Sequence, residues 1–110
     1  MQIEKLSDAL SVTGQVDPAE TEAIAKLGFR SLICNRPDGE QSDQPSWSAV
    51  EAAARKAGLE TRHIPVGGEL TIEDQTEVFA AALAQMPKPI LAFCRTGNRS
   101  TQLYRAQGEA

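Results

Sequence analysis

The chain has 110 residues, the length of one domain, and 41% of them are hydrophobic, which is enough for a single core and excludes a disordered chain. The formal net charge of −4 argues against a general nucleic-acid surface, which would be basic overall. No apolar stretch approaches the roughly 18–20 residues of a membrane span, and the N-terminal segment MQIEKLSDAL lacks the apolar core of a signal peptide. We therefore expect one soluble cytoplasmic domain over 1–110, with neither a membrane nor a nucleic acid as its partner.

Strand patterns and helix patterns alternate along the chain. Asp17 followed by Pro18, and Thr71 followed by Asp74, are typical helix starts. Residues 90–93 are an unbroken apolar run, as in a strand buried on both faces. In chain order, the predicted elements are a strand over 11–16, a helix over 17–27, a strand over 29–34, a loop over 35–45, a helix over 46–58, a strand over 59–66, a helix over 71–86, a strand over 90–93 and a last helix that begins near Arg99.

This alternation predicts a single α/β domain with a mainly parallel central sheet flanked by helices. In such sheets, ligands bind outside the carboxyl ends of the strands. Three predicted loops leave those ends, at residues 35–40, 67–69 and 94–99. We therefore expect a ligand site at the loop over 94–99, with the other two loops as its walls.

The cysteine and histidine content limits the chemistry that the chain offers. The sequence contains two cysteines, Cys34 and Cys94, and one histidine, His63. Two distant cysteines do not form a disulfide framework, and with one histidine they lack the spacing of a zinc site. A reducing cytosol would leave both thiols free. We expect neither a metal nor a cofactor.

The cysteine loop, residues 94–99 after the last predicted strand, carries the strongest chemical signal. A loop between a buried strand and a helix collects backbone N–H groups that the helix cannot satisfy, and the helix dipole adds positive potential there. Such surroundings lower the pKa of a cysteine and make Cys94 a candidate nucleophile beside an anion site. The alternative is an inert thiol in the core, but a loop glycine and two nearby arginines favour the reactive thiolate. The candidate anion-binding residues are Arg95, Thr96, Gly97, Asn98, Arg99 and Ser100.

The segment CRTGNRS is similar to the anion-binding loops of two groups of enzymes. Cysteine-dependent protein phosphatases carry Cys-x5-Arg-Ser/Thr, and rhodanese-type sulfurtransferases often carry Cys-Arg-x-Gly-x-Arg-Ser. Over residues 10–105, the segments NRPDGE, HIPVGGELT and FCRTGNRS resemble the phosphatase-like domain family of β-lactamase-hydrolase-like proteins. The resemblance implies a dual-specificity-phosphatase-like α/β fold, in a domain that stands alone or is fused to a metallo-β-lactamase-like persulfide-oxidising domain.

The sequence departs from the phosphatase pattern at two points. Arg99 follows Cys94 after four residues, one fewer than in phosphatases, and the smaller cradle would suit a persulfide or a sulfur oxyanion better than a phosphate ester. Phosphatases also use a general acid, usually an aspartate on a neighbouring loop. Here that loop offers only Glu69, for which a solvated loop acid is the alternative interpretation. Sulfur transfer needs less acid assistance, because thiolates and sulfite leave without a proton.

Other polar residues at the same sheet edge have two interpretations each. Arg36 and Asp38 either support the cysteine loop and the substrate or belong to a Pro-Asp-Gly turn. Cys34 is either a resolving thiol that traps an oxidised Cys94 as a disulfide or an inert thiol at a strand end. For His63 we expect a structural role.

Three functions are therefore predicted, in this order. The first is a cysteine-dependent phosphatase-like hydrolase, in which the Cys94 thiolate attacks phosphorus while loop amides and Arg99 stabilise the oxygens. The second is a rhodanese-like sulfurtransferase that takes sulfane sulfur from thiosulfate or glutathione persulfide through a Cys94 persulfide. The third is a non-catalytic anion-binding module. In the first two, the expected partner is an anionic substrate that contains phosphate or sulfur.

Overall fold

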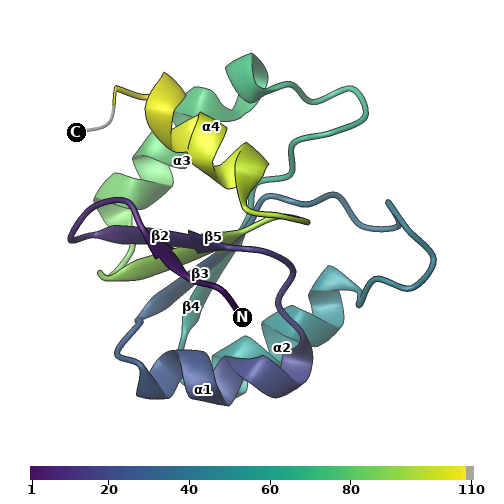
Figure 1. The fold of residues 1–110 in the computed structure, drawn as a ribbon, viewed down its shortest axis with the longest axis vertical. Helices are drawn as coiled ribbons and strands as arrows, with labels where there is room; N and C mark the ends of the chain where they lie inside the picture. The colour runs from purple at the N-terminus through teal and green to yellow at the C-terminus, as the bar shows by residue number, and fades with distance from the viewer. Residues whose placement is uncertain (109–110) are drawn as a thin grey trace.

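The computed structural model describes residues 1–108, which form an α/β domain around one sheet of five strands (Figure 1). The strand order is β1-β2-β5-β3-β4, and the pairs β2–β5, β5–β3 and β3–β4 are parallel, whereas β1 is antiparallel to β2. This arrangement confirms the predicted mainly parallel sheet. The strands are β1 (Glu4–Lys5), β2 (Leu10–Thr13), β3 (Ser31–Cys34), β4 (Glu60–His63) and β5 (Ile90–Phe93).

Helices cover both faces of the sheet (Figure 1). One layer contains α1 and α2 and the other contains α3 and α4. The capping box predicted at the start of α3 is present: Asp74 N–H donates to Thr71 Oγ1 at 3.1 Å, and Thr71 N–H donates to Asp74 Oδ2 at 3.0 Å. The helices are the 3-10 helix η1 (Pro18–Glu20), α1 (Thr21–Lys26), α2 (Trp47–Lys56), α3 (Ile72–Gln85) and α4 (Asn98–Ala106).

The central strand β5 is buried on both faces, as its apolar run predicts. Ile90 and Ala92 pack into the cluster under α3 and α4, whereas Leu91 and Phe93 pack into the cluster on the opposite face. All four side chains have no exposed surface. The two clusters therefore hold the end of β5, and the loop that follows it, between two packed layers.

Several element bounds differ from the predicted ones. The strand predicted over 11–16 ends at Thr13, because the chain turns at Gly14 to pass close to the cysteine loop. A Cβ atom on Gly14 would lie 3.0 Å from the Arg95 carbonyl oxygen. The helix predicted over 17–27 begins instead with the short turn η1, and β1 was not predicted, because two exposed residues leave no apolar pattern.

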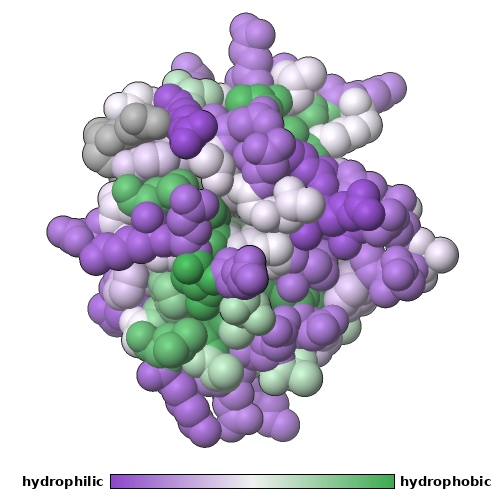
Figure 2. Space-filling model, in the orientation of Figure 1, coloured by the Kyte–Doolittle hydropathy of each residue, from purple (hydrophilic) through white to green (hydrophobic). Residues whose placement is uncertain are grey.

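The carboxyl ends of the parallel strands meet at one edge of the sheet. Thr13 and Cys34 both pair with Phe93, and Cys34 also pairs with His63. Cys94 therefore emerges between the ends of β2 and β3, as the predicted topology requires. No helix within residues 1–108 combines the length and apolar character that a membrane crossing requires. Hydrophilic residues cover most of the face shown in Figure 2, with hydrophobic residues in smaller groups between them.

Candidate active site

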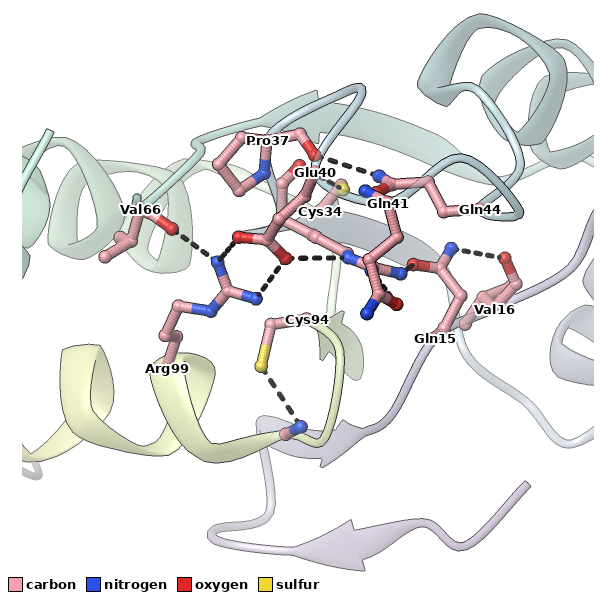
Figure 3. A network of polar contacts seen from close by, with 12 residues as sticks. Gln15, Val16, Cys34, Pro37, Glu40, Gln41, Gln44, Val66, Cys94 and Arg99 are labelled. Carbon is pink, nitrogen blue, oxygen red and sulfur yellow. Dashed lines mark hydrogen bonds and ion pairs between the residues drawn. The ribbon is translucent and has the colours of Figure 1, made fainter. Parts of the chain in front are cut away.

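Cys94 lies at the base of the loop that joins β5 to α4. Its side chain is almost fully buried, and Gly97 N–H donates to Cys94 Sγ at 3.1 Å (Figure 3). Burial by itself would raise the pKa of this thiol, but hydrogen bonds from the loop backbone outweigh burial and lower the pKa from its usual 9.0. The backbone donors are those of Ser100, Thr96, Arg99 and Gly97. The loop therefore stabilises a thiolate, as the sequence predicts.

Gly97 gives this loop a shape that other residues adopt only with strain. It precedes α4 with a φ of 93°, in the left-handed region. A Cβ atom on Gly97 would lie 3.4 Å from the Thr13 carbonyl oxygen, so the loop also packs closely on the end of β2. The glycine thus allows the N–H groups at the start of α4 to converge on Cys94.

Arg99 lies beside Cys94 and is held by a carboxylate from another loop. Its Nη1 and Nη2 donate to the two carboxylate oxygens of Glu40, at 2.8 and 2.9 Å, and Nη1 also donates to the Val66 carbonyl at 2.7 Å (Figure 3). The hydrogen bond with Glu40 raises the pKa of Arg99, and the nearby Cys94 raises it further. In return, Arg99 and then Arg36 lower the pKa of Glu40 to about 2. The guanidinium groups of Arg36 and Arg99 offset the Glu40 carboxylate and a Cys94 thiolate, so the convergent N–H groups at the start of α4 supply the positive potential that attracts an anion.

Arg36 is buried next to this ion pair, with 3% of its surface exposed. Its Nε donates to Glu40 at 3.0 Å, Nη1 to Gln15 at 2.9 Å and Nη2 to Gln41 at 3.1 Å. Its carbonyl oxygen accepts hydrogen bonds from Cys34 Sγ at 3.3 Å and from His63 Nε2 at 2.9 Å. Of the two interpretations of Arg36, these contacts favour support of the site.

A second polar link joins α4 to the ends of β3 and β4. Ser100 Oγ donates to Asn35 Oδ1 at 2.8 Å, and Asn35 Nδ2 donates to the Ile64 carbonyl at 2.8 Å. Ser100 and Asn35 have no exposed surface. The Ser100 hydroxyl proton is thus directed to Asn35, while the Ser100 backbone N–H serves Cys94.

Other predicted site residues lie at or near the surface. Arg95, Thr96 and Asn98 are exposed on the cysteine loop, where their side chains are open to a ligand from solvent. Glu69 is exposed in the tight turn closed by Gly67 N–H donating to the Leu70 carbonyl at 2.8 Å. The structure brings the cysteine loop together with Arg36 and Glu40 and leaves Glu69 at the tip of a neighbouring turn.

Asp38 and Cys34 have structural partners. Asp38 Oδ1 accepts a hydrogen bond from Trp47 N–H at 2.7 Å, which holds the start of α2. Burial raises the pKa of Cys34 to about 12, so this thiol stays protonated, and both cysteines are free thiols in the structure. Trp47 stacks on His63 with ring centroids 5.4 Å apart, which gives His63 a structural position. Residues 1–108 contain no cluster of three or more His, Cys, Asp or Glu side chains placed to hold a metal ion.

Sequence reasoning did not single out Glu40, Asn35 or Gly67. Gly67 has a φ of 147°, and a Cβ there would lie 2.8 Å from Pro37 Cγ and 3.3 Å from Arg99 Nη1, so only a glycine lets these groups converge. The sequence does place Glu40, an acid, on a loop at the same sheet edge as Arg36 and Arg99, which would have made an ion pair a reasonable prediction. The spacing alone could not show which arginine it pairs with.

A mainly parallel α/β sheet with a cysteine between a buried strand and a helix is the arrangement expected of a phosphatase-like domain. The chain belongs to the family described as "Beta-lactamase hydrolase-like protein, phosphatase-like domain", which matches residues 2–110. This result confirms the family resemblance and the fold predicted from the sequence.

Relatives and solved structures agree with this assignment. Beta-lactamase hydrolase-like proteins from Xylella fastidiosa and Agrobacterium fabrum are 38% and 34% identical to the chain, over 94% and 100% of its length. The chain spans about a quarter of these relatives, 24% and 25% of their lengths. A candidate phosphatase from Neisseria meningitidis has the same fold, with a TM-score of 0.86 and 36% identity, over 94% of this chain and 74% of that one.

Proposed function

We propose that this domain is a cysteine-dependent hydrolase of phosphatase type, with Cys94 as its nucleophile. The observation that carries the proposal is the convergence of loop N–H groups on Cys94 Sγ with Arg99 beside it. The same donors that stabilise the thiolate can hold the oxygens of an anionic substrate above it. The family assignment supports phosphate chemistry, because the domain is phosphatase-like.

The proposed reaction has two steps. In the first, Cys94 Sγ forms a bond to phosphorus while the bond between phosphorus and the leaving oxygen breaks, and the leaving oxygen takes the electron pair. In the second, water attacks the phosphocysteine, inorganic phosphate is released and Cys94 returns to the thiolate. Arg99 and the loop N–H groups stabilise the three remaining phosphoryl oxygens in both steps.

The proton for an alkoxide leaving group needs a separate donor. Glu40 is unsuitable, because its pair with Arg99 and its contact with Arg36 hold its pKa at about 2 and keep it ionised. In the phosphatase proposal Glu69 donates this proton. Its turn, which begins at Gly67, directly follows Val66, whose carbonyl accepts a hydrogen bond from Arg99. Phenolic esters, whose leaving group is more stable as an anion, need the least help.

Sulfur transfer is a second candidate function, and the state of Glu40 favours it. The carboxylate paired with Arg99 cannot supply a proton, and sulfur leaving groups need none. Cys94 Sγ would attack the outer sulfur of thiosulfate, the sulfur–sulfur bond would break, and sulfite would leave with the electron pair. A second thiolate, such as that of glutathione, would then take the outer sulfur from the Cys94 persulfide and release the Cys94 thiolate.

One experiment distinguishes the two functions. The protein is incubated with p-nitrophenyl phosphate, and separately with thiosulfate followed by glutathione or cyanide, and the mass of Cys94 is measured after each donor. Phosphate release that is lost in Cys94→Ser supports the phosphatase proposal. Addition of one sulfur atom to Cys94 without phosphate release overturns it in favour of sulfur transfer. Neither product, with anion binding retained, would indicate an anion-binding module.

A further inference from the structure

A buried arginine outside the cysteine loop is connected to Arg99 through one carboxylate. Arg36 Nε donates to Glu40 Oε1 at 3.0 Å, and Arg99 Nη2 donates to the same oxygen at 2.9 Å. We propose that Arg36 is a positioning residue, which acts through Glu40 to fix the guanidinium of Arg99 in the orientation that binds an oxyanion over Cys94. This inference rests on the proposed role of Arg99 in the reaction.

Burial makes Arg36 the fixed point of this arrangement. It is 3% exposed, and each of its three guanidinium nitrogens donates to a side-chain oxygen, of Gln15, Glu40 or Gln41. A buried charge is stable only when it is paired and hydrogen-bonded, so these contacts hold Arg36 in one place. Gln15 is itself held, because its Nε2 donates to the Val16 carbonyl at 2.9 Å (Figure 3).

Glu40 would be poorly fixed without this anchor. Its side chain is 32% exposed and that of Arg99 is 21% exposed. An ion pair between partly exposed side chains holds its geometry weakly, because water competes for both charges and ordering the two side chains costs entropy. The buried Arg36 binds the oxygen that Arg99 also uses and restricts the carboxylate to one orientation. Pre-organisation of this kind is what an anion-binding group requires.

Glu40 and the Val66 carbonyl do not use all the donors of Arg99, and the side chain of Arg99 also has a hydrogen-bonding interaction with Cys94. Glu40 and the Val66 carbonyl use both hydrogens of Nη1 and one hydrogen of Nη2. The other hydrogen of Nη2 and the Nε–H lie on one edge of the planar group, the pair of donors that binds an oxyanion with two parallel hydrogen bonds. Rotation of Glu40 would turn this edge, which is why the anchor at Arg36 matters for binding.

Binding of inorganic oxyanions to the full chain tests the inference without requiring turnover. Isothermal titration calorimetry in a Cys94→Ser background, in which thiosulfate cannot transfer its sulfur, gives the dissociation constants of phosphate and of thiosulfate for Arg36→Gln, Glu40→Gln and their double variant. We expect Arg36→Gln to weaken binding by about tenfold when Glu40 is present and by less than about twofold when Glu40→Gln is also present. Independent, additive effects of the two substitutions would overturn the positioning role.

Two further variants keep the test decisive. If Arg36→Gln does not fold, Arg36→Lys retains the buried positive charge. An ammonium group cannot reproduce the three hydrogen bonds of the planar guanidinium, so Arg36→Lys should also weaken binding only when Glu40 is present. Gln44→Ala removes hydrogen bonds that support the same loop, one from Gln41 N–H and one to the Pro37 carbonyl, and should leave the dissociation constants within about twofold. If Gln44→Ala weakens binding as much as Arg36→Gln, Arg36 acts only as a support for its loop.

The outcome also distinguishes this inference from the proposed function. If Arg99→Lys leaves phosphate and thiosulfate binding unchanged, or if the unaltered protein binds neither anion, the proposed function fails together with everything that rests on it. If Arg99→Lys weakens binding but the effects of Arg36 and Glu40 are additive, only the positioning role fails.

Discussion

Replacing Glu40 with glutamine would change the pH dependence of stability in a way that the structure specifies. The hydrogen bond from Arg99, with a smaller contribution from Arg36, lowers the pKa of Glu40 from 4.5 to about 2 in the folded protein. This difference corresponds to about 3 kcal/mol of stabilisation. Because 32% of the side chain is exposed, solvent screening reduces the expected contribution to about 1 kcal/mol.

The pH window follows from the sign of this change. Above pH 4.5 the carboxylate is ionised in both the folded and the unfolded chain, so the full stabilisation is present. It is lost as the pH falls through about 2, where the folded protein also takes up the proton. Glu40→Gln should therefore lower the free energy of unfolding by about 1 kcal/mol at neutral pH, and this deficit should shrink as the pH falls toward about 3.

Urea unfolding at several pH values, followed by the fluorescence of Trp47, measures the free energy of unfolding and its change with pH. Glu69→Gln is the matched control, because Glu69 is an exposed acid on the neighbouring turn, and it should stay within about 0.5 kcal/mol of the unaltered protein at each pH. A deficit in Glu40→Gln that is the same at neutral and acid pH would refute the electrostatic account of the Arg99–Glu40 pair.

Three other predictions concern the cysteines, a turn and a buried amide. The rate at which Cys94 reacts with iodoacetamide should reach half its maximum below pH 9.0, because the loop lowers the pKa of this thiol. Cys34, with a pKa of about 12, should react only after unfolding. If the rate for Cys94 reaches half its maximum only at or above pH 9.0, the loop does not stabilise the thiolate. Gly67→Ala should cost about 2 kcal/mol in thermal or urea unfolding and weaken phosphate binding, because its Cβ would clash with a proline ring. Gly68→Ala is its control and should cost about 1 kcal/mol for backbone strain alone, since a Cβ there has no neighbour within 4 Å; equal costs would contradict the clash. Asn35→Ala should cost about 2 kcal/mol in urea unfolding, because it leaves a buried hydroxyl and a carbonyl without their partner, and a loss under about 0.5 kcal/mol would show that water replaces the amide.

The fold was predictable because its signals are local. The apolar run over 90–93 gave β5, and the capping pair of Thr71 and Asp74 gave the start of α3. The predicted bounds were wrong where a tertiary contact ends an element, as at Gly14, which turns the chain toward the cysteine loop. The short edge strand β1 has no periodic pattern, so only its pairing with β2 reveals it.

The candidate site was predictable in part for the same reason. Cys94, Gly97 and Arg99 lie within six residues at the junction of β5 and α4, and the chemistry of a strand–loop–helix cradle follows from their spacing. Glu40 was missed, because its importance comes from contacts with Arg99 and Arg36 that the sequence order does not encode. The choice of Glu69 as the acid rested on loop order alone, and its role stays a prediction.

The sequence by itself determined the class of the protein: a mainly parallel α/β domain with a cysteine nucleophile candidate at the carboxyl edge of its sheet. These properties depend on hydrophobic periodicity, helix caps and the composition of one loop, all of which act over a few residues. Only the tertiary structure decided how the charges around CRTGNRS are arranged. Arg99 is paired with Glu40, and the buried Arg36 contacts the same carboxylate. Folding brings the loops after β3, β4 and β5 to one edge of the sheet, so contacts between residues distant in the sequence set the orientation of these charged side chains.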